Sequence, residues 1–487
     1  MSRSLVLRLL IGISVVWAAW AVWTIQGRSQ PFSVVVIDDL GQPIPAAKIG
    51  WQGRVLAETD GEGHARLQWE RGLLGLSVTA AGFQGTNLPL LSPPTTEVEA
   101  VLRASFLRGQ IVDAENQPLE GAYVTTGSQT AVSDAEGRFA VRNAEPGTVQ
   151  VWRPAWEGSA FDWDGQSGQE RFEIAPEMLK AVHIGGEAAE KSWSSFLRMV
   201  ERTELNAVMI DLKDESGAVF FDSANETART IGAVDVRYDL ADLVGSAHQA
   251  NAYVIGRIVA FQDPIAAVGA PDWAVWDTAL NAPYEANGQY FLDPTDPGAQ
   301  GYALELATEA CELGVDEIQF DYVRFPDSRR EGARFDGGIS SEVRVVTVRD
   351  FLGTAVAALH PLGCAVGADI FGFITSAVDD GGIGQQWEEL TKVVDVASPM
   401  LYPSHYTSGW YGYQVPSDHP GPLVAEALDD ALTRLAREIV VRPWLQDFSY
   451  NEEQVRAQIE EAEERGLGWM LWNATSEVSV GALRSNP

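Results

Sequence analysis

The stretch VDEIQFDYVRFP, Val315–Pro326, decides the fold of this chain. It follows Gly314, is rich in β-branched and aromatic residues, and alternates polar with apolar side chains. Side chains two apart on a strand share a face, so Glu317, Gln319 and Asp321 lie on one side and the apolar residues on the other. The apolar side must pack on helices. The pattern therefore predicts a barrel strand whose polar side chains point inward, with Asp321 at its carboxyl end.

Seven further runs of this kind recur along residues 178–487, each separated from the next by an amphipathic stretch. With the fourth run they are Lys180–Gly186, Ala207–Asp214, Tyr253–Phe261, Val315–Pro326, Cys364–Phe373, Val393–Tyr406, Val440–Phe448 and Leu467–Thr475. The stretch after the first run carries one helical stripe: Trp193, Phe196, Leu197 and Val200. Eight units predict a closed (β/α)8 TIM barrel, in which active sites lie at the carboxyl ends of the strands.

Residues 1–30 are predicted to be a signal peptide or a membrane anchor. Arg3 and Arg8 give the segment a basic start, and an almost uncharged run follows from Leu9 to Ile25. Leu5–Ile25 is about as long as a membrane-spanning helix needs to be. The triplet Ala19–Ala21 offers a small-x-small cleavage site, but the apolar run continues past it. We favour an N-terminal hydrophobic helix that anchors the chain. Either alternative places the remainder outside the cytoplasm.

Residues 31–177 contain an internal duplication with an offset of about 75 residues. Two motifs occur in each copy: Gly41–Ile49 then Thr59–Leu67, and Asn116–Val124 then Ser133–Val141. Short β runs alternate with Gly, Asp and Pro turns, which predicts two small antiparallel, all-β sandwich modules, 31–104 and 105–177. They resemble the carboxypeptidase-regulatory-like and bacterial Ig-like modules of cell-surface proteins, which act as spacers or adhesion surfaces. The second motif of each copy contains an acidic pair, Asp60 with Glu62 and Asp134 with Glu136. Such residues are favoured in turns, and this explains the pairs better than a calcium-binding site does.

Composition excludes several classes of function. The chain has 68 acidic and 34 basic residues, a formal charge of −34, which disfavours nucleic acid and anionic lipid surfaces as partners. Its two cysteines, Cys311 and Cys364, cannot form a disulfide scaffold, and a single bridge between them is the less favoured possibility. There is no GxSxG, no phosphate-binding GxxxxGK[ST] and no dinucleotide fingerprint after a strand.

Polar and aromatic residues at the predicted strand ends form the candidate site. Asp321 and Asp369, on adjacent strands, are the predicted catalytic pair, because glycoside hydrolysis uses two carboxyl groups that flank the scissile bond. The chain has six His, too few near strand ends for a His-rich metal site, so no metal is predicted. A metal held by Asp211, Asp321 and Asp369 alone stays open. Predicted substrate-binding residues are Asp211, Lys213, Arg257, Gln319, Tyr402, His405, Trp410, Gln446 and Trp472.

Four segments carry a resemblance to a known family. They are Gly314–Pro326, Met209–Gly217, Gly367–Phe373 and Ser398–Tyr406. Together they resemble the barrel domain of a bacterial family of glycoside-hydrolase-like proteins of unknown specificity, over roughly residues 178 to 480. The resemblance implies a TIM barrel, a carbohydrate substrate and no known cofactor. It supplies no secured catalytic residues.

A second similarity concerns the fourth run alone. VDEIQFD is similar to the DGxRxD strand of α-amylase-type glycosidases, whose last Asp is the nucleophile, and this matches Asp321. The sequence departs from that pattern at Gln319, where the pattern has Arg. The chitinase-type pattern DxxDxDxE fails because Val323 occupies the position of its acid.

The sequence therefore predicts an exported glycoside hydrolase that acts on a cell-envelope or extracellular polysaccharide through Asp321 and Asp369. The alternative is a catalytically inactive barrel that binds glycan or an envelope protein. Geometry separates the two. Carboxyl groups roughly 5 to 10 Å apart in an open groove fit hydrolysis, whereas an Asp321 buried against Arg257 or Arg324 fits a structural role.

Overall fold

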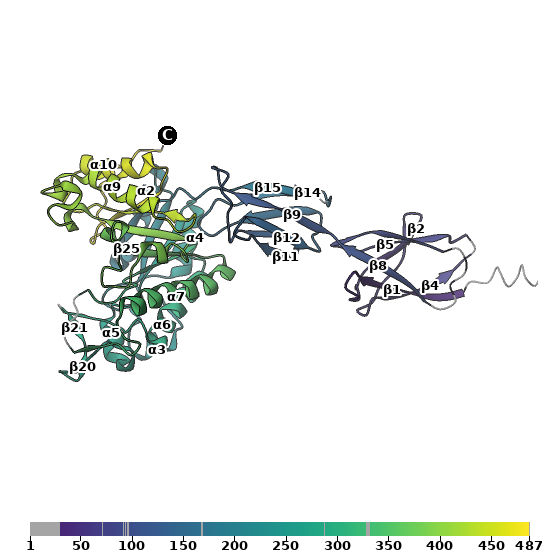
Figure 1. Ribbon diagram of the computed structural model, residues 1–487, viewed down its shortest axis with the longest axis horizontal. Helices are drawn as coiled ribbons and strands as arrows, with labels where there is room; N and C mark the ends of the chain where they lie inside the picture. Colours follow the sequence, from purple (N-terminus) through teal and green to yellow (C-terminus); the bar gives the residue numbers. More distant parts are fainter. Residues whose placement is uncertain are drawn as a thin grey trace, which may run out of the picture. The chain divides into compact units, whose positions relative to one another are not determined.

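A computed structural model describes most of the chain after the N-terminal segment (Figure 1). The described residues are 30–70, 72–90, 92, 94, 97–166, 169–286, 288–327 and 332–486. The predicted anchor, Leu5–Ile25, lies outside them. Two compact units result, the first formed by residues 1–153 and 158–175 and the second by residues 154–157 and 176–487.

The second unit contains a closed barrel of parallel strands. In ring order they are β16 (Lys180–Ile184), β17 (Ala207–Lys213), β18 (Tyr253–Val259), β23 (Glu317–Asp321), β25 (Ala365–Phe371), β26 (Val396–Leu401), β27 (Val440–Val441) with β28 (Trp444–Gln446), and β29 (Trp469–Trp472). Pairing of β29 with β16 closes the ring. Every predicted run contains its strand, so the predicted TIM barrel is confirmed. The seventh position is split at Pro443, which has no N–H for the ladder.

Helices connect the strands and cover the outside of the barrel. The longer ones are α2 (Gly186–Arg202), α4 (Leu240–Gln249), α6 (Pro297–Glu312), α7 (Ser341–Leu359), α9 (Pro420–Thr433) and α10 (Glu452–Glu464). Shorter ones are α3 (Glu226–Thr230), α5 (Pro264–Gly269) and α8 (Trp387–Leu390). In α2, Phe196 and Val200 are buried, as the helical stripe predicts. The segment Ser341–Leu362 is long and apolar enough to cross a membrane, yet α7 within it packs on β25.

Loops at the carboxyl ends of the strands carry smaller elements. Short strands are β19 (Trp276–Asp277), β20 (Ala282–Pro283), β21 (Glu285–Ala286), β22 (Gln289–Tyr290) and β24 (Ala333–Arg334). Single 3-10 turns lie at Pro271–Trp273, Gly372–Thr375, Pro403–His405, Trp410–Gly412, Pro416–Asp418 and Val480–Ala482. A further turn, His360–Leu362, lies between α7 and the start of β25. The turns after β25 and β26 bring aromatic side chains over the barrel mouth.

A disulfide joins Cys311 near the end of α6 to Cys364 just before β25, with Cα atoms 5.9 Å apart. The sequence disfavours a bridge between the two cysteines, but the structure contains it. Spacing along the chain did not reveal it because 53 residues separate the two cysteines. They meet because β23, which follows α6, pairs with β25, so the end of that helix lies near the start of β25.

The described residues of the first unit form four β-sheets, two for each copy of the duplication. The first copy has β4 (His64–Trp69), β1 (Gln30–Asp38), β8 (Glu97–Ala104) and β6 (Phe83–Gln84) in one sheet, and β3 (Arg54–Glu58), β2 (Lys48–Trp51), β5 (Gly75–Thr79) and β7 (Thr86–Pro89) in the other. The second has β11 (Gln129–Val132), β10 (Tyr123–Thr126), β13 (Gly147–Trp152) and β14 (Ser159–Trp163), and β12 (Arg138–Arg142), β9 (Phe106–Val112) and β15 (Gln169–Glu173).

Each copy buries alternate side chains of its strands. In the first, Val34 and Val36 of β1 join Val78 of β5 in one core drawn from both sheets. β1 pairs with β8, and β9 pairs with β15, in parallel, because the first and last strands of each copy run in the same direction. The prediction of antiparallel modules did not include these two parallel pairs. The boundary between residues 104 and 105 stays a prediction.

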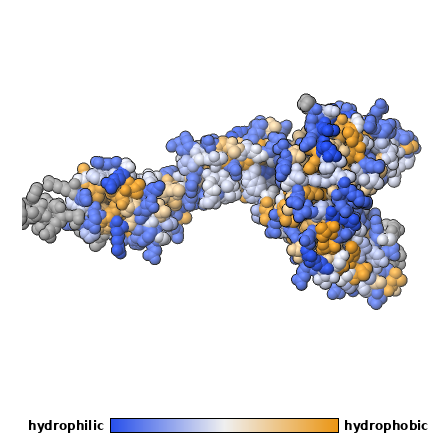
Figure 2. All heavy atoms as spheres, turned by 180° about the vertical axis from the view of Figure 1, so that it is seen from behind, coloured by the Kyte–Doolittle hydropathy of each residue, from blue (hydrophilic) through white to orange (hydrophobic). Residues whose placement is uncertain are grey.

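Aspartate side chains in the repeated turns accept hydrogen bonds from the backbone of their own turn. Asp60 Oδ1 accepts hydrogen bonds from the backbone N–H groups of Glu62 and His64, at 3.0 and 2.9 Å. Asp134 repeats this geometry in the second copy. The turn interpretation is confirmed. Figure 2 shows hydrophilic residues spread over the visible face of both units, in keeping with the excess of acidic residues.

Candidate active site

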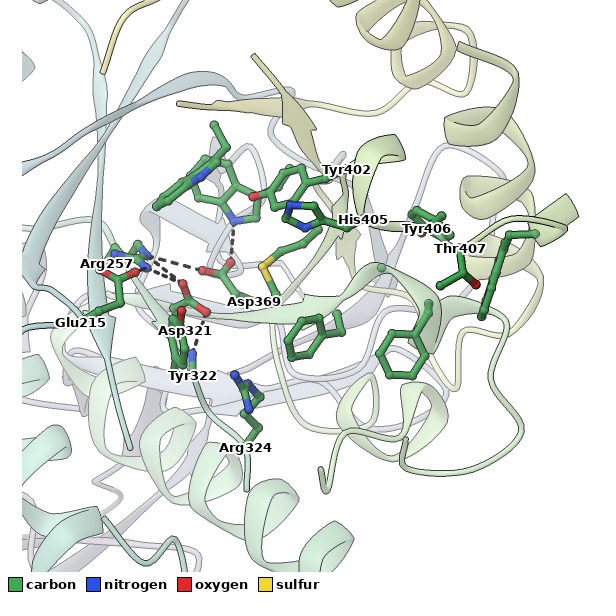
Figure 3. A pocket seen from close by; sticks show the side chains of 17 residues that line it. Glu215, Arg257, Asp321, Tyr322, Arg324, Asp369, Tyr402, His405, Tyr406 and Thr407 are labelled. Carbon is green, nitrogen blue, oxygen red and sulfur yellow. Dashed lines mark hydrogen bonds and ion pairs between the residues drawn. The ribbon is translucent and has the colours of Figure 1, made fainter. Parts of the chain in front are cut away.

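A cavity of about 500 Å³ opens at the carboxyl ends of the barrel strands (Figure 3). Its floor is polar, with Glu215, Arg257, Asp321 and Asp369. Its walls are mainly aromatic or apolar and include Tyr322, Phe371, Phe373, Met400, Tyr402, His405, Tyr406, Trp410, Trp444 and Trp472, with Arg324, Gly372 and Thr407. The volume lies within the usual range of small-molecule pockets, roughly 300 to 1,000 Å³.

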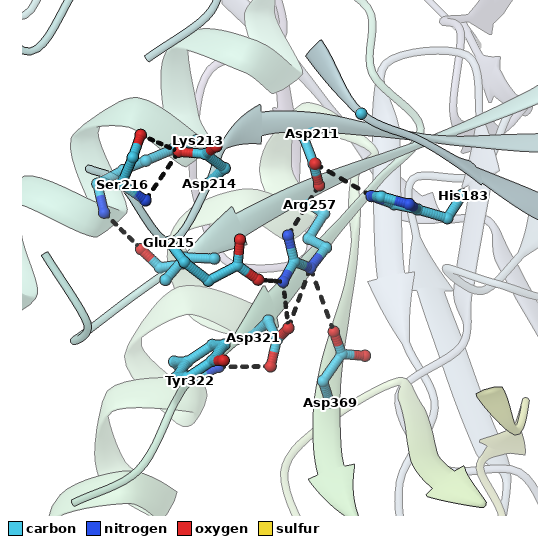
Figure 4. A network of polar contacts seen from close by, with 12 residues as sticks. His183, Asp211, Lys213, Asp214, Glu215, Ser216, Arg257, Asp321, Tyr322 and Asp369 are labelled. Carbon is cyan, nitrogen blue, oxygen red and sulfur yellow. Dashed lines mark hydrogen bonds and ion pairs between the residues drawn. The ribbon is translucent and has the colours of Figure 1, made fainter. Parts of the chain in front are cut away.

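Arg257 on β18 is the centre of the polar floor (Figure 4). Its Nη1 lies 2.8 Å from Asp211 Oδ1, and its Nε and Nη2 lie 3.0 and 2.5 Å from Asp321 Oδ2. Nη2 also donates to Glu215 Oε1, and Nε is 4.0 Å from Asp369 Oδ2. The Arg257 side chain is only 1% exposed, so its guanidinium interacts with the four carboxyl groups away from bulk water. Barrel register brings them together, since Arg257 pairs with Asp211 on β17.

Asp321 ends β23 and is held from two sides. Besides its contacts with Arg257, its Oδ1 accepts a hydrogen bond of 2.6 Å from the backbone N–H of Tyr322. Tyr322 has a φ of 47°, in the left-handed region that bulky residues rarely adopt. Strained residues of this kind persist where the surrounding structure imposes them, and they cluster at functional sites. Asp321 as a whole residue is 6% exposed, and it lines the cavity.

Asp369 on β25 has a different environment. It is 1% exposed, and its Oδ1 accepts a 2.6 Å hydrogen bond from Trp444 Nε1. Burial raises the pKa of Asp369 well above its ordinary value, and the neighbouring charge of Asp321 raises it further, although Arg257 and the Trp444 hydrogen bond oppose this. A raised pKa keeps the carboxyl group protonated to higher pH. The surroundings of Asp369 thus favour its protonated form.

Asp211 lies on the inner strand surface but does not line the cavity. Its Oδ2 is 3.0 Å from His183 Nε2, and His183 Nδ1 is 3.1 Å from the carbonyl oxygen of Asn473. Burial raises the pKa of Asp211, but the charges of His183 and Arg257 lower it more, to about 2. Asp211 therefore fixes His183 and Arg257 from behind the cavity.

The structure brings together seven of the eleven residues predicted for the site. These seven line the cavity: Asp321, Asp369, Arg257, Tyr402, His405, Trp410 and Trp472. The other four are bound to protein groups: Asp211, Lys213, Gln319 and Gln446. Trp472 packs over the Arg257 guanidinium, 4.9 Å from its ring centre to Cζ.

Lys213, Gln319 and Gln446 have structural partners. Lys213 Nζ is 3.0 Å from Asp263 Oδ2 and donates to the Val259 carbonyl at 2.7 Å. An irregular register between Asp211 and Lys213 separates the two side chains that strict alternation had placed on one face. Gln319 Nε2 donates to Ser398 Oγ. Gln446 Oε1 accepts from the backbone N–H of Ser404 at 3.1 Å.

Sequence reasoning missed two charged residues of the cavity, Glu215 and Arg324. Both follow the end of a strand, where alternation no longer fixes the direction of a side chain. The segments that carry them, Met209–Gly217 and Gly314–Pro326, are ones on which the family resemblance rests, and that was the available signal.

A metal does not fit the three aspartates that the sequence left open as ligands. Arg257 already places a cation between Asp211, Asp321 and Asp369. Among the described residues, no group of three or more His, Cys, Asp or Glu side chains has the arrangement of a metal site.

Comparison with known proteins identifies the family. Residues 181–478 match the family described as "Putative glycosyl hydrolase domain". The chain belongs to this family. No curated protein matches the sequence. The matched residues span the whole barrel from β16 to the loop after β29, so the glycosyl hydrolase domain includes every residue of the cavity.

Solved structures similar to the chain include three bacterial proteins. A hypothetical protein from Ruminiclostridium thermocellum is 30% identical, covering 38% of this chain and 96% of that one, with a TM-score of 0.35. The glycoside hydrolase domain of PgaB (BpsB) from Bordetella bronchiseptica is 14% identical over 62% and 95% of the chains, with a TM-score of 0.46. That of PelA from Pseudomonas aeruginosa is 14% identical over 61% and 96%, with a TM-score of 0.37.

Proposed function

We propose that this family member is an exported glycoside hydrolase that cleaves a cell-envelope or extracellular polysaccharide with Asp369 as general acid and Asp321 as nucleophile or base. One observation carries the proposal. Two carboxyl groups from adjacent strands line one cavity: Asp321 Oδ2 is hydrogen-bonded to Arg257 Nε at 3.0 Å, and Asp369 Oδ2 lies 4.0 Å from the same nitrogen. Hydrolysis of a glycosidic bond requires such a pair, with one member protonated and the other ionised.

The burial of Asp369 suits it to the acid role. Its raised pKa keeps a proton available for the leaving-group oxygen, and the Trp444 hydrogen bond holds Oδ1 so that Oδ2 is the oxygen nearer Arg257. As the proton leaves, the new negative charge on Asp369 is stabilised by that nearby guanidinium. A buried carboxylic acid beside a fixed cation is an environment suited to a general acid.

Asp321 suits the second role because it is paired with a fixed cation. The DGxRxD pattern of α-amylase-type enzymes has Arg where this chain has Gln319. Arg257 supplies a guanidinium instead, since its Cα is in register with Gln319 and its side chain reaches Asp321. The departure at Gln319 is thereby compensated from the neighbouring strand. Asp321 would attack the anomeric carbon or activate a water molecule, while Asp369 protonates the departing oxygen.

The cavity walls suit a sugar ring. Sugars bind to flat apolar surfaces with hydrogen-bonding groups at the edge. Trp472 and Trp444 form one such corner, with ring centres 5.4 Å apart and planes at 88°. Trp410 lies against Tyr406 at 5.5 Å on the opposite loop cluster. The polar floor between these walls contains Asp321 and Asp369.

Export is supported by the disulfide. Bridges such as Cys311–Cys364 persist in oxidising compartments and are rare in the cytosol.

If Leu5–Ile25 is an anchor, full-length protein will sediment with membranes and protein beginning at Gln30 will stay soluble. A mature chain beginning at Val22 in the external fraction would instead identify a signal peptide.

Activity is tested by incubating the protein from Gln30 onward with a polysaccharide panel and measuring new reducing ends. Wild type should cleave at least one polymer and Asp321→Asn should not, although circular dichroism should show this variant still folded, because Arg257 keeps the carboxyl groups of Asp211, Glu215 and Asp369. A variant at an exposed site, Asp222→Asn, is the matched control because Asp222 is 74% exposed and paired only at the surface. Cleavage by Asp321→Asn at the wild-type rate would exclude the proposed pair.

One observation favours a glycan-binding barrel without catalysis. Asp321 is 6% exposed and bound twice by Arg257, the geometry expected of a structural ion pair. If no polymer in the panel is cleaved, yet one is bound equally by wild type and Asp321→Asn, the binding function replaces hydrolysis.

A further inference from the structure

Arg324 lines the cavity but takes no part in the carboxylate cluster. It follows the strand that ends in Asp321 (Figure 3). Its side chain is 7% exposed. The guanidinium lies over two rings, with Cζ 4.8 Å from the centre of Phe371 and 4.9 Å from that of Tyr322. Stacking of this kind fixes a planar guanidinium while leaving its N–H groups free at the edge.

The hydrogen bonds of Arg324 are incomplete among the described residues. Nη1 donates to the Phe325 carbonyl at 3.1 Å, and the nearest carboxylate, Asp327, is 4.0 Å away and 58% exposed. Nε and Nη2 have no hydrogen-bond partner in the described part of the chain, and neither is sealed from solvent. Arg257 is the opposite case, with four carboxyl groups around it. Arg324 is therefore the cavity cation with donors left for a ligand.

We propose that the substrate carries a carboxylate on a sugar near the scissile bond, and that Arg324 binds it through the Nε and Nη2 edge. This rests on the proposed hydrolase function of the same cavity. A guanidinium edge matches a carboxylate with two parallel N–H···O bonds, which gives both strength and orientation. A neutral sugar would leave this buried charge with Asp327, 4.0 Å away and largely exposed, as its nearest counter-ion, which compensates poorly for the burial.

The net charge of the chain constrains the polymer further. A formal charge of −34 repels a dense polyanion over long range. Recognition by Arg324 is of short range and needs only one carboxylate. We therefore infer an acidic heteropolysaccharide, in which uronic-acid or similar carboxylated sugars are spaced among neutral ones.

The test uses carboxylated polysaccharides, each paired with its carboxyl-reduced form. Gellan and xanthan carry one uronic acid per repeating unit, and hyaluronan and alginate are denser polyanions. Reduction converts the carboxylate to a hydroxymethyl group and preserves the linkage. Affinity is measured with Asp321→Asn, which is expected to bind without turnover, and cleavage is measured with wild type. We expect a carboxylated form to be preferred over its reduced form at least tenfold.

Arg324→Gln should remove that preference. Loss of a charge-assisted pair corresponds to about a 10- to 100-fold loss of affinity for the carboxylated form, with less than threefold change for the reduced form. Arg324→Lys should recover part of the loss if the protein folds, because it keeps the charge without the fork. Arg334→Gln is the control, since Arg334 is 59% exposed and outside the cavity lining.

The outcomes separate this inference from the hydrolase proposal. Binding that depends on Arg324 without any cleavage supports carboxylate recognition and excludes hydrolysis. Cleavage that is equal for carboxylated and reduced forms, or unchanged in Arg324→Gln, supports hydrolysis and overturns carboxylate recognition. Binding to none of the four carboxylated polymers, or a stronger preference for dextran sulfate, also overturns it.

Discussion

The guanidinium of Arg257 on β18 contacts the carboxylate of Asp321 on β23 through two nitrogens, at 3.0 and 2.5 Å. This contact joins adjacent strands at the floor of the cavity, where both side chains are almost completely buried. The effect of such a pair on the stability of the fold is seen when one of its two partners is removed. A buried charge that loses its partner destabilises the fold strongly, even where the pair itself contributes little.

Arg257→Met should therefore lower the free energy of unfolding by about 3–5 kcal/mol, because Asp321 and Asp211 lose their cation. Urea denaturation measures the difference. The control Arg229→Met breaks a surface pair with Asp222, whose side chains are 51% and 74% exposed, and should cost at most about 1 kcal/mol. Equal losses in the two variants would show that the cluster does not stabilise the barrel.

Replacement of the two aspartates should separate their roles. Asp369→Asn removes the proton donor and should lower kcat on polysaccharide by about 10²- to 10⁴-fold. Substrates with activated leaving groups, such as nitrophenyl glycosides, should be spared because they need little protonation. Asp321→Asn should be inactive on both kinds of substrate. If Asp369→Asn loses both activities equally, Asp369 is not the acid.

Glu177, at the amino-terminal end of the barrel, should make stability depend on pH. Its Oε2 is buried without a hydrogen-bond partner among the described residues, and burial raises its pKa from 4.5 to about 7. The folded state thus holds this proton more tightly than the unfolded chain. The stabilising contribution is complete below pH 4.5 and is lost as pH rises through about 7.

Melting temperatures across that range measure the effect. Between pH 4.5 and pH 7, Glu177→Gln should reduce the decline seen in wild type, because an amide does not titrate. Glu464→Gln, at an exposed position, should decline as wild type does. A decline that is the same in all three proteins would assign the pH dependence to other groups.

The disulfide should stabilise the second unit by restricting its unfolded chain. For a loop closed across 53 residues the chain-entropy estimate is about 4 kcal/mol, and measured values run from about 2 to 4. Unfolding midpoints in urea with and without reductant measure this. Wild type should lose stability on reduction, whereas the double variant Cys311→Ser, Cys364→Ser should start low and not respond.

The sequence alone determined the architecture and the rim of the site. Periodic strands predicted the barrel because alternation of polar and apolar residues needs only local information. The same alternation placed Asp321 and Asp369 at neighbouring strand ends, where both line the cavity. Duplicated turn motifs predicted two β modules before any contact between strands was known.

The tertiary structure decided how those residues are paired. Lys213 follows Asp211 by two residues, yet an irregular register separates the partners of the two side chains. Glu215 and Arg324 lie beyond strand ends, where no period fixes their direction, and the disulfide joins cysteines that only the order of the strands brings together. A repeating pattern determines which face a residue takes, but ion pairs depend on distances between segments far apart in the chain, and these are set only when the barrel closes.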